Sequence, residues 1–500
     1  MKNTKISHQI VVGAIITFFG MVFGKGLIYL YVALIARLGS SEYGLLSLGF
    51  TITSFLVFIS MLGLNTGLTR YIPFFIGKNN DKKIKGTVLS SIKISVPISL
   101  FFTFLLFFFA NKISINIFHN SNLVPILRLF SFTIPLIVLS NLFASVMIGF
   151  KKVTYQIVIN EVIENIVKFV LTFVLIYFGY KVFGAAIAYL ISVIVTFILS
   201  LYFVQKKTFK IINKNIKTEF ITKELFKFSL PLFFAGLFTL VIKWGDLLLI
   251  GYFRTASDVG IYNATLATAS LLTLVPTALM IIFLPIVTNL YSKKNKKEIN
   301  EVSIRTSKWI FFCNLPIFIM LLILSRDILR IMFGGEYIIG TTSFIILLFG
   351  YMIHSLTHIN SSILIMMKKT KMVFHIGLVT SLFSITINLL LIPRYGIIGG
   401  AIGTSFALIL DYFIYAFLAY RLSGNFTLKL SYIKFIISAL ISTFIIYLLK
   451  EDINISIGNT IVLSVAFSII YLILNILLKS FDKEDKYILS SFFNKFLRKG

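Results

Sequence analysis

The chain is dominated by apolar segments that are long enough to cross a bilayer. The hydrocarbon core is about 30 Å thick, so a spanning helix needs roughly 20 apolar residues. With 58% hydrophobic and only 13% charged residues, the composition excludes a water-soluble domain. We predict an all-α, polytopic membrane protein with about 14 transmembrane helices. The predicted spans lie near residues 10–35, 43–65, 86–109, 124–149, 157–178, 181–204, 228–253, 259–291, 304–325, 338–366, 371–392, 396–420, 430–449 and 456–478.

Short motifs at loops and helix ends in the first half of the chain recur in the second half at a nearly constant offset. Each match is short, but several matches in one register indicate an internal duplication of six helices. Because six crossings return the chain to the side where it began, both halves enter the membrane from the same side, as parallel repeats do. The matched segments are 38–44 with 254–260 (offset 216), 183–188 with 398–403 (215), Lys151-Lys152 with Lys368-Lys369 (217) and, more loosely, Pro73 with Pro285 (212), the last pair ending the second helix of each half.

The repeat divides the chain into four regions. Residues 1–204 form an N-terminal lobe of helices 1–6, and residues 228–420 form a C-terminal lobe of helices 7–12. Residues 205–227 form a lysine-rich cytoplasmic linker, which we expect to act as a flexible strap between the lobes. Residues 421–500 supply helices 13 and 14 and a cytoplasmic tail, with no counterpart in the first half.

The basic residues that give the formal net charge of +29 are distributed unevenly between the two sides of the membrane. With a cytoplasmic N-terminus, the inside segments hold 34 Lys and Arg residues and the outside loops hold eight. This asymmetry follows the positive-inside rule and places both termini in the cytoplasm. We therefore interpret the lysine-rich segments 206–227 and 293–308 as topology determinants and contacts to membrane lipids with anionic head groups, with ligand binding as the alternative. Nucleic acid is not an expected partner.

The outside loops are too short to hold a catalytic domain. The longest run to about a dozen residues. No Walker lysine loop and no His or Cys spacing suited to a closed zinc site occurs. The sequence therefore predicts a protein that is not an enzyme and that needs no cofactor or metal.

Three lysines lie deep inside predicted spans: Lys25, Lys168 and Lys243. A charged side chain near the bilayer centre costs at least about 2.5–3.5 kcal/mol on insertion scales, so such a residue usually faces a polar cavity or a partner. Lys25 has no acidic residue in its own span. We predict that the three lysines line a cationic, water-filled cavity that binds an anionic substrate, whereas Lys93 and Arg128 lie near span ends and snorkel.

Acidic residues offer some of these lysines a local partner. Glu161, Glu164 and Lys168 are spaced by three and four residues and share one helix face. This spacing fits either a self-neutralising Glu164–Lys168 pair or a polar stripe facing the cavity. Lys243 stands three residues before Asp246. The same alternatives of self-pairing and a cavity role apply there.

The second half contains another isolated acid inside a span, Asp411. It either binds a coupling proton or cation or pairs with a lysine on another helix. His354 and His358 stand one turn apart in helix 10. Two histidines are a weak argument for a metal, so packing or hydrogen bonds between helices are the favoured interpretation.

Three sequence stretches carry a family resemblance. They are Ala-Arg-Leu-Gly-Ser-Ser-Glu-Tyr-Gly-Leu at 36–45, Gly-Leu-Asn-Thr-Gly-Leu-Thr-Arg-Tyr-Ile-Pro at 63–73 and Pro-Arg-Tyr-Gly-Ile-Ile-Gly-Gly-Ala at 393–401. The chain resembles the polysaccharide transporters, or oligosaccharide flippases, of the multidrug/oligosaccharidyl-lipid/polysaccharide exporter superfamily. The resemblance covers helices 1–12, and we expect it to extend to all fourteen.

The resemblance implies a V-shaped transporter whose two six-helix lobes alternate between inward-facing and outward-facing states. Its expected cargo is a polyprenyl-phosphate or pyrophosphate-linked oligosaccharide or polysaccharide repeat unit, moved from the cytoplasmic to the outer leaflet of the plasma (inner) membrane. Glycosyltransferases or a polymerase of the same pathway are candidate partners. Two alternatives remain: a cation-coupled multidrug or metabolite antiporter of the same superfamily, and a membrane enzyme of glycan assembly.

Overall fold

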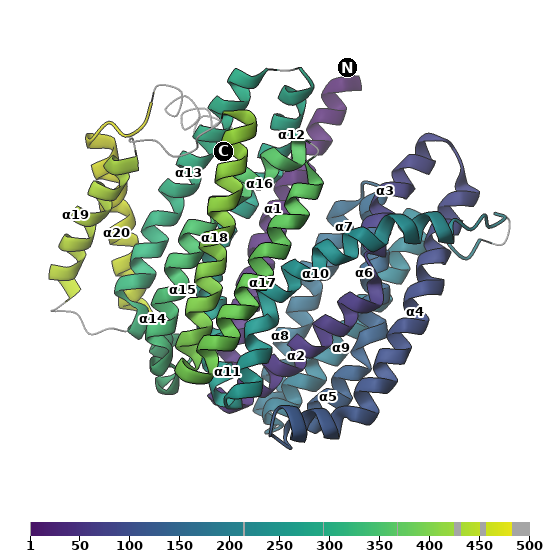
Figure 1. Ribbon diagram of the computed structural model, residues 1–500, viewed down its shortest axis with the longest axis horizontal. Helices are drawn as coiled ribbons and strands as arrows, with labels where there is room; N and C mark the ends of the chain where they lie inside the picture. Colours follow the sequence, from purple (N-terminus) through teal and green to yellow (C-terminus); the bar gives the residue numbers. More distant parts are fainter. Residues whose placement is uncertain are drawn as a thin grey trace. The chain divides into compact units, whose positions relative to one another are not determined.

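The computed structural model describes residues 2–213, 216–293, 295–367, 369–424, 432–450 and 457–482. Within these residues every regular element is a helix and no strand occurs (Figure 1). The predicted all-α fold is confirmed. Helices are the expected result for apolar segments of this length, because lipid offers no partner to backbone N–H and C=O groups. The predicted tail beyond residue 482 and Lys368 of the repeated lysine pair lie outside the described residues.

The first half of the chain contains helices up to α9 and three short π-helical segments. Their bounds are α1 (Lys2–Ala36), α2 (Ser40–Met61), α3 (Leu64–Gly77), α4 (Asp81–Lys112), η1 (Ile113–Ile117), α5 (Leu123–Ser131), α6 (Thr133–Gly149), α7 (Val153–Ile157), η2 (Val158–Ile163), α8 (Glu164–Tyr177), α9 (Lys181–Phe203) and η3 (Val204–Thr208).

The second half continues with α10 to α20 and two 3₁₀ segments. Their bounds are α10 (Thr222–Phe253), α11 (Ala256–Ala269), η4 (Ser270–Thr273), α12 (Leu274–Ser292), α13 (Lys296–Ile323), α14 (Ser325–Met332), η5 (Gly335–Gly340), α15 (Thr341–His354), α16 (Thr357–Met366), α17 (Thr370–Tyr395), α18 (Ile397–Ser423), α19 (Tyr432–Lys450) and α20 (Ile457–Leu477).

Each of the fourteen predicted spans overlaps helical residues in the described part of the chain. Eleven helices in the described part of the chain are long and apolar enough to cross a membrane, or twelve when α5 and α6 count as one span bent by 43°. Pro135 explains that bend, because it lacks the N–H that would bond the preceding turn. Residues 153–177 are helical but carry three charged side chains, and α19 has a shorter apolar stretch, Tyr432–Leu448.

The second predicted span ends earlier than its sequence suggested. The backbone is left-handed at Leu62 (φ 46°) and Gly63 (φ 72°), which ends α2 and starts α3. A Cβ on Gly63 would lie 2.6 Å from the carbonyl oxygen of Ser229, so only glycine permits this approach of α10. The prediction that Pro73 ends this helix is wrong, because Pro73 lies inside α3.

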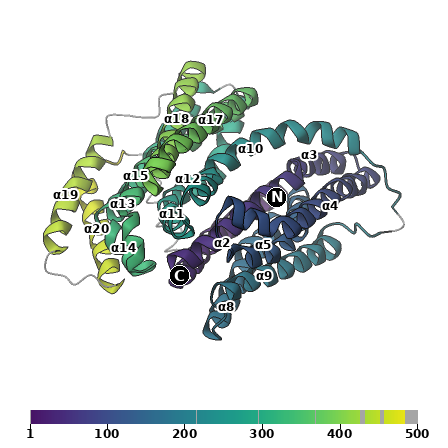
Figure 2. The same cartoon turned by 60° about the horizontal axis from the view of Figure 1, so that its bottom comes forward.

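The helices form two compact units. Unit 1 comprises Met1–Thr268, Met332–Phe344 and Phe374–Ala407, and unit 2 comprises Ala269–Ile331, Ile345–Val373 and Leu408–Gly500. In unit 1, α4 packs against α5 and α6, while α9 packs against α6 and α8 (Figures 1 and 2). Unit 1 also takes in α10 and α11, so these packing units do not follow the repeat. The repeat-based domain boundaries stay a prediction.

In unit 2, the terminal pair α19 and α20 packs on α13 through aromatic side chains (Figures 1 and 2). Phe312 stacks on Tyr471 with ring centroids 5.3 Å apart, and Phe311 stacks on Tyr432 at 5.0 Å. Between helices in lipid, such van der Waals packing replaces the hydrophobic effect as the main attraction. These rings therefore fix the two terminal helices to α13.

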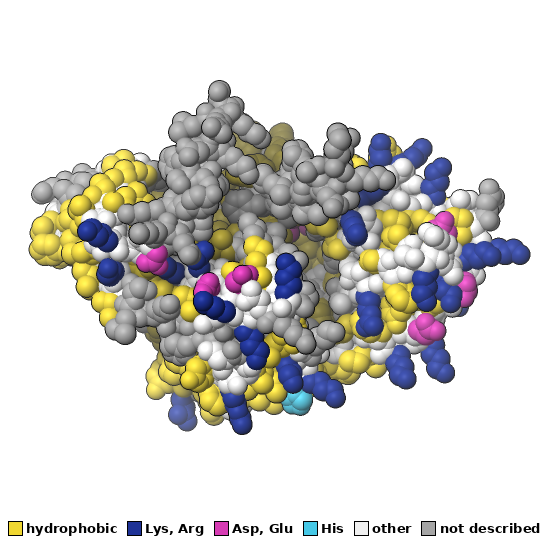
Figure 3. All heavy atoms as spheres, turned by 90° about the horizontal axis from the view of Figure 1, so that it is seen from above, with side chains coloured by type: hydrophobic (Ala, Val, Ile, Leu, Met, Phe, Trp, Pro, Cys, Tyr) yellow, Lys and Arg dark blue, Asp and Glu magenta, His cyan; other side chains and the backbone are white. Residues whose placement is uncertain are grey.

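The linker between the repeats is anchored at the start of α4, on a face where Lys and Arg side chains are abundant (Figure 3). The buried Lys85 ammonium donates to the carbonyls of Asn213 (2.7 Å) and Ile216 (2.9 Å). Lys83 forms an ion pair with Glu219 at 3.1 Å. A Cβ on Gly86 would lie 1.7 Å from the Glu219 carbonyl oxygen, so the two backbones touch. This docking differs from the expected flexible strap.

Replacing Lys85 with Ala should release the linker. The change removes two charge-assisted hydrogen bonds, which should weaken the docking by about 1.5–3 kcal/mol. Hydrogen exchange of residues 210–221 in detergent should rise accordingly. Lys82→Ala is the matched control, because the Lys82 side chain is exposed and only its backbone carbonyl contacts the linker, at Glu219. Equal exchange in the Lys85 variant and the wild type would contradict the anchoring role.

Candidate functional site

The three predicted lysines all belong to unit 1. Lys25 lies on α1, Lys168 on α8 and Lys243 on α10. Lys25 is close enough to interact electrostatically with both other lysines. Lys25 and Lys243 have exposed side chains, whereas Lys168 is buried. Two helices of the first half and one of the second therefore contribute cations to the same region.

Two glycines on α1 determine how closely this helix approaches α7 and η2. A Cβ on Gly24 would lie 2.5 Å from the Glu161 carbonyl oxygen, and one on Gly20 would lie 2.8 Å from the Ile157 side chain. Such a pair of small residues four positions apart lets helix backbones touch in a membrane. The contact fixes Lys25, the next residue, beside η2. This π-helical segment is also a local irregularity of the kind often found at functional sites.

Lys168 is held by an aromatic ring rather than by a local ion pair. Its Nζ lies 4.9 Å from the ring centroid of Tyr31, a cation–π geometry. No ion pair within 4.0 Å joins Lys168 to Glu164, although Glu164 and Glu161 both attract it at longer range. Both acids are half-buried. The direct Glu164–Lys168 pair is therefore not formed, and Tyr31 is a partner that the sequence analysis missed.

Lys243 and Asp246 also have separate environments. The Lys243 ammonium lies 5.1 Å from the ring centroid of Trp244. Asp246 is 1% exposed and accepts hydrogen bonds from the Tyr262 hydroxyl (2.6 Å), the Thr404 hydroxyl (2.8 Å) and the Leu247 N–H (2.8 Å). Self-pairing of Lys243 with Asp246 does not occur. The carboxylate instead joins α10 to α11 and α18.

Sequence reasoning missed Tyr262 and Thr404, although one signal was available. Tyr262 follows the repeated segment 254–260 by two residues, and Thr404 directly follows the repeated segment 398–403. Because the repeat indicates where these helices begin, it also indicates the position of a hydroxyl that lies next to a repeated connection. The identity of its partner depends on how three helices cross, which the linear spacing does not give.

Asp411 in unit 2 lies beside a histidine. Its Oδ2 is 3.7 Å from Nδ1 of His354, and the rings of His354 and His358 are 5.7 Å apart. These residues come from α18, α15 and α16, and the chain breaks its helix between the last two. In the described part of the chain, no three His, Cys, Asp or Glu residues gather in a way that could hold a metal ion. His354 is thus one neighbour of Asp411, and the choice between a coupling role and pairing with a lysine stays a prediction.

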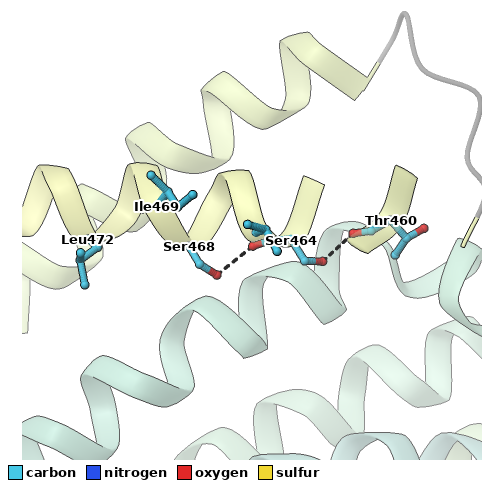
Figure 4. A pocket seen from close by; sticks show the side chains of 6 residues that line it. Thr460, Ser464, Ser468, Ile469 and Leu472 are labelled. Atoms are coloured by element: carbon cyan, nitrogen blue, oxygen red, sulfur yellow. Dashed lines mark hydrogen bonds between the residues drawn. The ribbon is translucent and has the colours of Figure 1, made fainter. Parts of the chain in front are cut away.

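A shallow groove of about 460 Å³ runs along α20 in unit 2 (Figure 4). The Ser464 hydroxyl donates to the Thr460 carbonyl and the Ser468 hydroxyl donates to the Ser464 carbonyl, both at 2.8 Å. These hydroxyl protons are used within the helix, so the groove offers a mainly apolar surface. None of the predicted site residues lines it. Its lining residues are Thr460, Ser464, Val465, Ser468, Ile469 and Leu472.

Comparison with known families decides the class of the protein. The model of the family described as "Polysaccharide biosynthesis protein" matches residues 10–291, more than half of the chain. The chain belongs to this family. The MatE family model matches residues 231–390. The protein is therefore a multi-pass membrane transporter of the multidrug/oligosaccharidyl-lipid/polysaccharide exporter superfamily, as the resemblance predicted.

Curated relatives of this transporter come from archaea and bacteria. An uncharacterised membrane protein of Methanocaldococcus jannaschii is 23% identical over 84% of the chain and 85% of its own length. A putative O-antigen transporter of Shigella flexneri is 23% identical over 69% and 83%. The probable low-salt glycan biosynthesis flippase Agl15 of Haloferax volcanii is 25% identical over 38% and 40%.

Solved structures show the same fold. A multidrug resistance MATE family transporter in its inward-facing conformation aligns with a TM-score of 0.69 at 14% identity, covering 82% of this chain and 98% of the other. At that identity the likeness concerns the fold alone. The arrangement of helices is thus shared between drug transporters and this member of the polysaccharide family.

The separate environments of Lys243 and Asp246 predict different effects on stability. Asp246→Ala should lower the free energy of unfolding by about 1–3 kcal/mol, because it removes the carboxylate to which the buried Tyr262 and Thr404 hydroxyls donate. Lys243→Ala should leave stability unchanged, since its side chain is exposed. Thermal unfolding of both variants in one detergent tests this. Equal losses would mean that the two residues act as a pair.

Proposed function

We propose that this transporter is a flippase for polyprenyl-phosphate or pyrophosphate-linked oligosaccharides or polysaccharide repeat units. The observation that carries the proposal is that Lys25 on α1 interacts electrostatically with both Lys168 on α8 and Lys243 on α10. Holding like charges together in a membrane protein is unfavourable unless anions compensate them. Glu161 and Glu164 supply part of that compensation around Lys168. A phosphate or pyrophosphate head group would supply the rest.

The lysines contribute in different ways. Lys25 and Lys243 have exposed ammonium groups, so they would contact the phosphate oxygens directly. Lys168 is covered by Tyr31 and would act through its field rather than by contact. An ammonium is a compact point charge with three rotatable donors, which suits a head group that must bind and leave during each cycle. The prenyl chain, which is apolar, would remain in lipid.

The names of two relatives support the same substrate class. One is a putative O-antigen transporter and the other a probable glycan biosynthesis flippase. We propose movement from the cytoplasmic to the outer leaflet of the plasma (inner) membrane by alternating access, with both termini in the cytoplasm. Glycosyltransferases or a polymerase of the same pathway would supply and consume the cargo.

One observation favours a second candidate, a cation-coupled antiporter of drugs or metabolites. The MatE model matches residues 231–390, and the aligned solved structures include a multidrug transporter. His354 and Asp411 would then hold the coupling proton. The two candidates differ in cargo, because a drug antiporter binds cationic or neutral amphiphiles, which a cluster of lysines repels. Transport of fluorescent cations, compared with transport of lipid-linked oligosaccharide, distinguishes them.

Neutralising the exposed lysines should impair transport. In proteoliposomes containing a fluorescent lipid-linked oligosaccharide, Lys25→Ala and Lys243→Ala should each reduce flipping about tenfold or more, the value of one charge-assisted contact. Lys25→Arg should retain part of the activity, because it keeps the charge with a different shape. Flipping is scored by protection of the glycan from an external reagent.

Lys112→Ala is the control for this experiment. Lys112 is exposed near the end of α4 and lies outside the lysine cluster, and its substitution changes the net charge equally. It should flip cargo at the wild-type rate. Wild-type flipping by both Lys25→Ala and Lys243→Ala would overturn the cationic head-group site.

A further inference from the structure

The first turns of α2 and α11 touch backbone to backbone. A Cβ added to Gly44 would lie 1.7 Å from the carbonyl oxygen of Ala256, and one added to Gly260 would lie 2.0 Å from that of Ser40. No side chain fits at such distances, so both positions require glycine. We call the contact of these four residues the α2–α11 crossing.

The α2–α11 crossing is symmetric with respect to the internal repeat. Gly260 follows Gly44 by 216 positions, and Ala256 follows Ser40 by the same number, which is the offset of the repeated segments 38–44 and 254–260. Each repeat thus presents the same glycine and the same carbonyl position to the other. The repeated connection was a sign of duplication in the sequence. In the structure it is a self-complementary contact between the two halves of the chain.

A relay of hydrogen bonds joins the crossing to a third segment. The hydroxyls of Ser40 and Ser257 are 2.7 Å apart. Oε2 of Glu336, in η5, accepts from the Ser40 hydroxyl at 2.7 Å and from the Ser40 N–H at 3.0 Å. Since the Ser40 hydroxyl has one proton and gives it to Glu336, the Ser257 hydroxyl donates to Ser40. The carboxylate therefore orients both serines.

Further hydrogen bonds lie on either side of the α2–α11 crossing. The Asn263 amide on α11 donates to the Tyr43 hydroxyl and to the Ser47 hydroxyl on α2, each at 2.8 Å. The Tyr337 hydroxyl donates to the carbonyl of Ala36 at 3.0 Å, which ties η5 to the end of α1. All of these residues belong to unit 1. Hydrogen bonds and backbone contacts thus join α2, α11, η5 and the end of α1.

We infer that the α2–α11 crossing is the gate at the predicted outer end of the transport path, with Glu336 as its latch. The inference rests on the proposed flippase function, which requires this end to open. The chemistry suits a reversible closure. Glu336 is exposed and Ser257 is half-exposed, so water can replace each hydrogen bond when the helices separate. The glycines bring the two helix backbones into contact without a large apolar side chain between them that would resist opening.

A disulfide tests the gate directly. In a Cys313→Ser background, Ser40→Cys with Ser257→Cys should oxidise readily, because the hydroxyl oxygens that the sulfurs replace are already 2.7 Å apart. Cys313 is the single native cysteine. Oxidation should reduce transport at least about tenfold, and dithiothreitol should restore it. Ser41→Cys with Ser257→Cys is the control, since Ser41 is exposed and has no contact with Ser257 among the hydrogen bonds of the crossing.

Two results would overturn the gate: full transport by the oxidised pair, or no more cross-linking of the pair than of the control. The cross-linking yield does not depend on the cargo. If the reduced pair and the wild type both fail to move lipid-linked oligosaccharide while the disulfide still forms, the proposed function fails and the crossing itself stands.

The latch is tested by Glu336 variants in the same cysteine pair. Glu336→Ala should lower the rate of disulfide formation several-fold, because the backbone N–H of residue 40, which the cysteine keeps, loses its acceptor and the closed state becomes less populated. Glu336→Gln should fall between, since its amide oxygen still accepts without the charge. Glu224→Ala is the control, because Glu224 is an exposed acid in the first turn of α10 and its loss changes the net charge equally. An unchanged rate in Glu336→Ala would mean that the carboxylate is not the latch.

Discussion

The absence of water in the hydrocarbon core governs every level of this structure. Backbone groups must bond within their own helix, so the chain crosses the membrane as helices. The same absence removes the hydrophobic effect as a force between helices, and close van der Waals contact takes its place. Glycines consequently decide where helices approach most closely. Gly24 sets α1 against η2, Gly63 admits α10 next to α3, and Gly44 and Gly260 close the α2–α11 crossing.

Three of the buried charges in the described part of the chain are stabilised in three different ways. Lys168 lies on the face of Tyr31, Asp246 accepts two hydroxyls and an N–H, and the Lys85 ammonium is bonded to carbonyls of the docked linker. None of these groups depends on a neighbour in its own helix for an ion pair. Partners on other helices are costly to lose, because the remaining group stays buried. Charge in this transporter therefore holds particular helices together as well as offering a binding surface.

The two proposed functional sites of unit 1 differ in chemistry. The lysine cluster supplies a strong, long-range field that attracts an anion. The α2–α11 crossing uses neutral hydroxyls, an amide and one carboxylate, which form short-range contacts that water can replace. A transporter needs both kinds of interaction, because the substrate site must recognise charge while the barrier to its exit must open without a large energetic cost.

The sequence by itself determined the helices, their approximate limits, the duplication and the family. These follow from the length of apolar runs and from short motifs, which are local properties of the chain. The prediction that Pro73 ends a helix was wrong, because the length of the apolar run does not indicate the left-handed turn at Leu62 and Gly63. The sequence analysis also expected a flexible linker, whereas Lys85 anchors this linker to α4.

Only the tertiary structure decided which side chains meet. Spacing by three or four residues predicted that Lys168 could pair with Glu164 and Lys243 with Asp246. In the structure, Lys168 lies against the ring of Tyr31. Asp246 accepts hydrogen bonds from Tyr262 and Thr404. The physical reason is that spacing fixes only the face of one helix. The rotation and depth of its neighbours, set by contacts such as Gly24 on Glu161, decide what lies opposite that face.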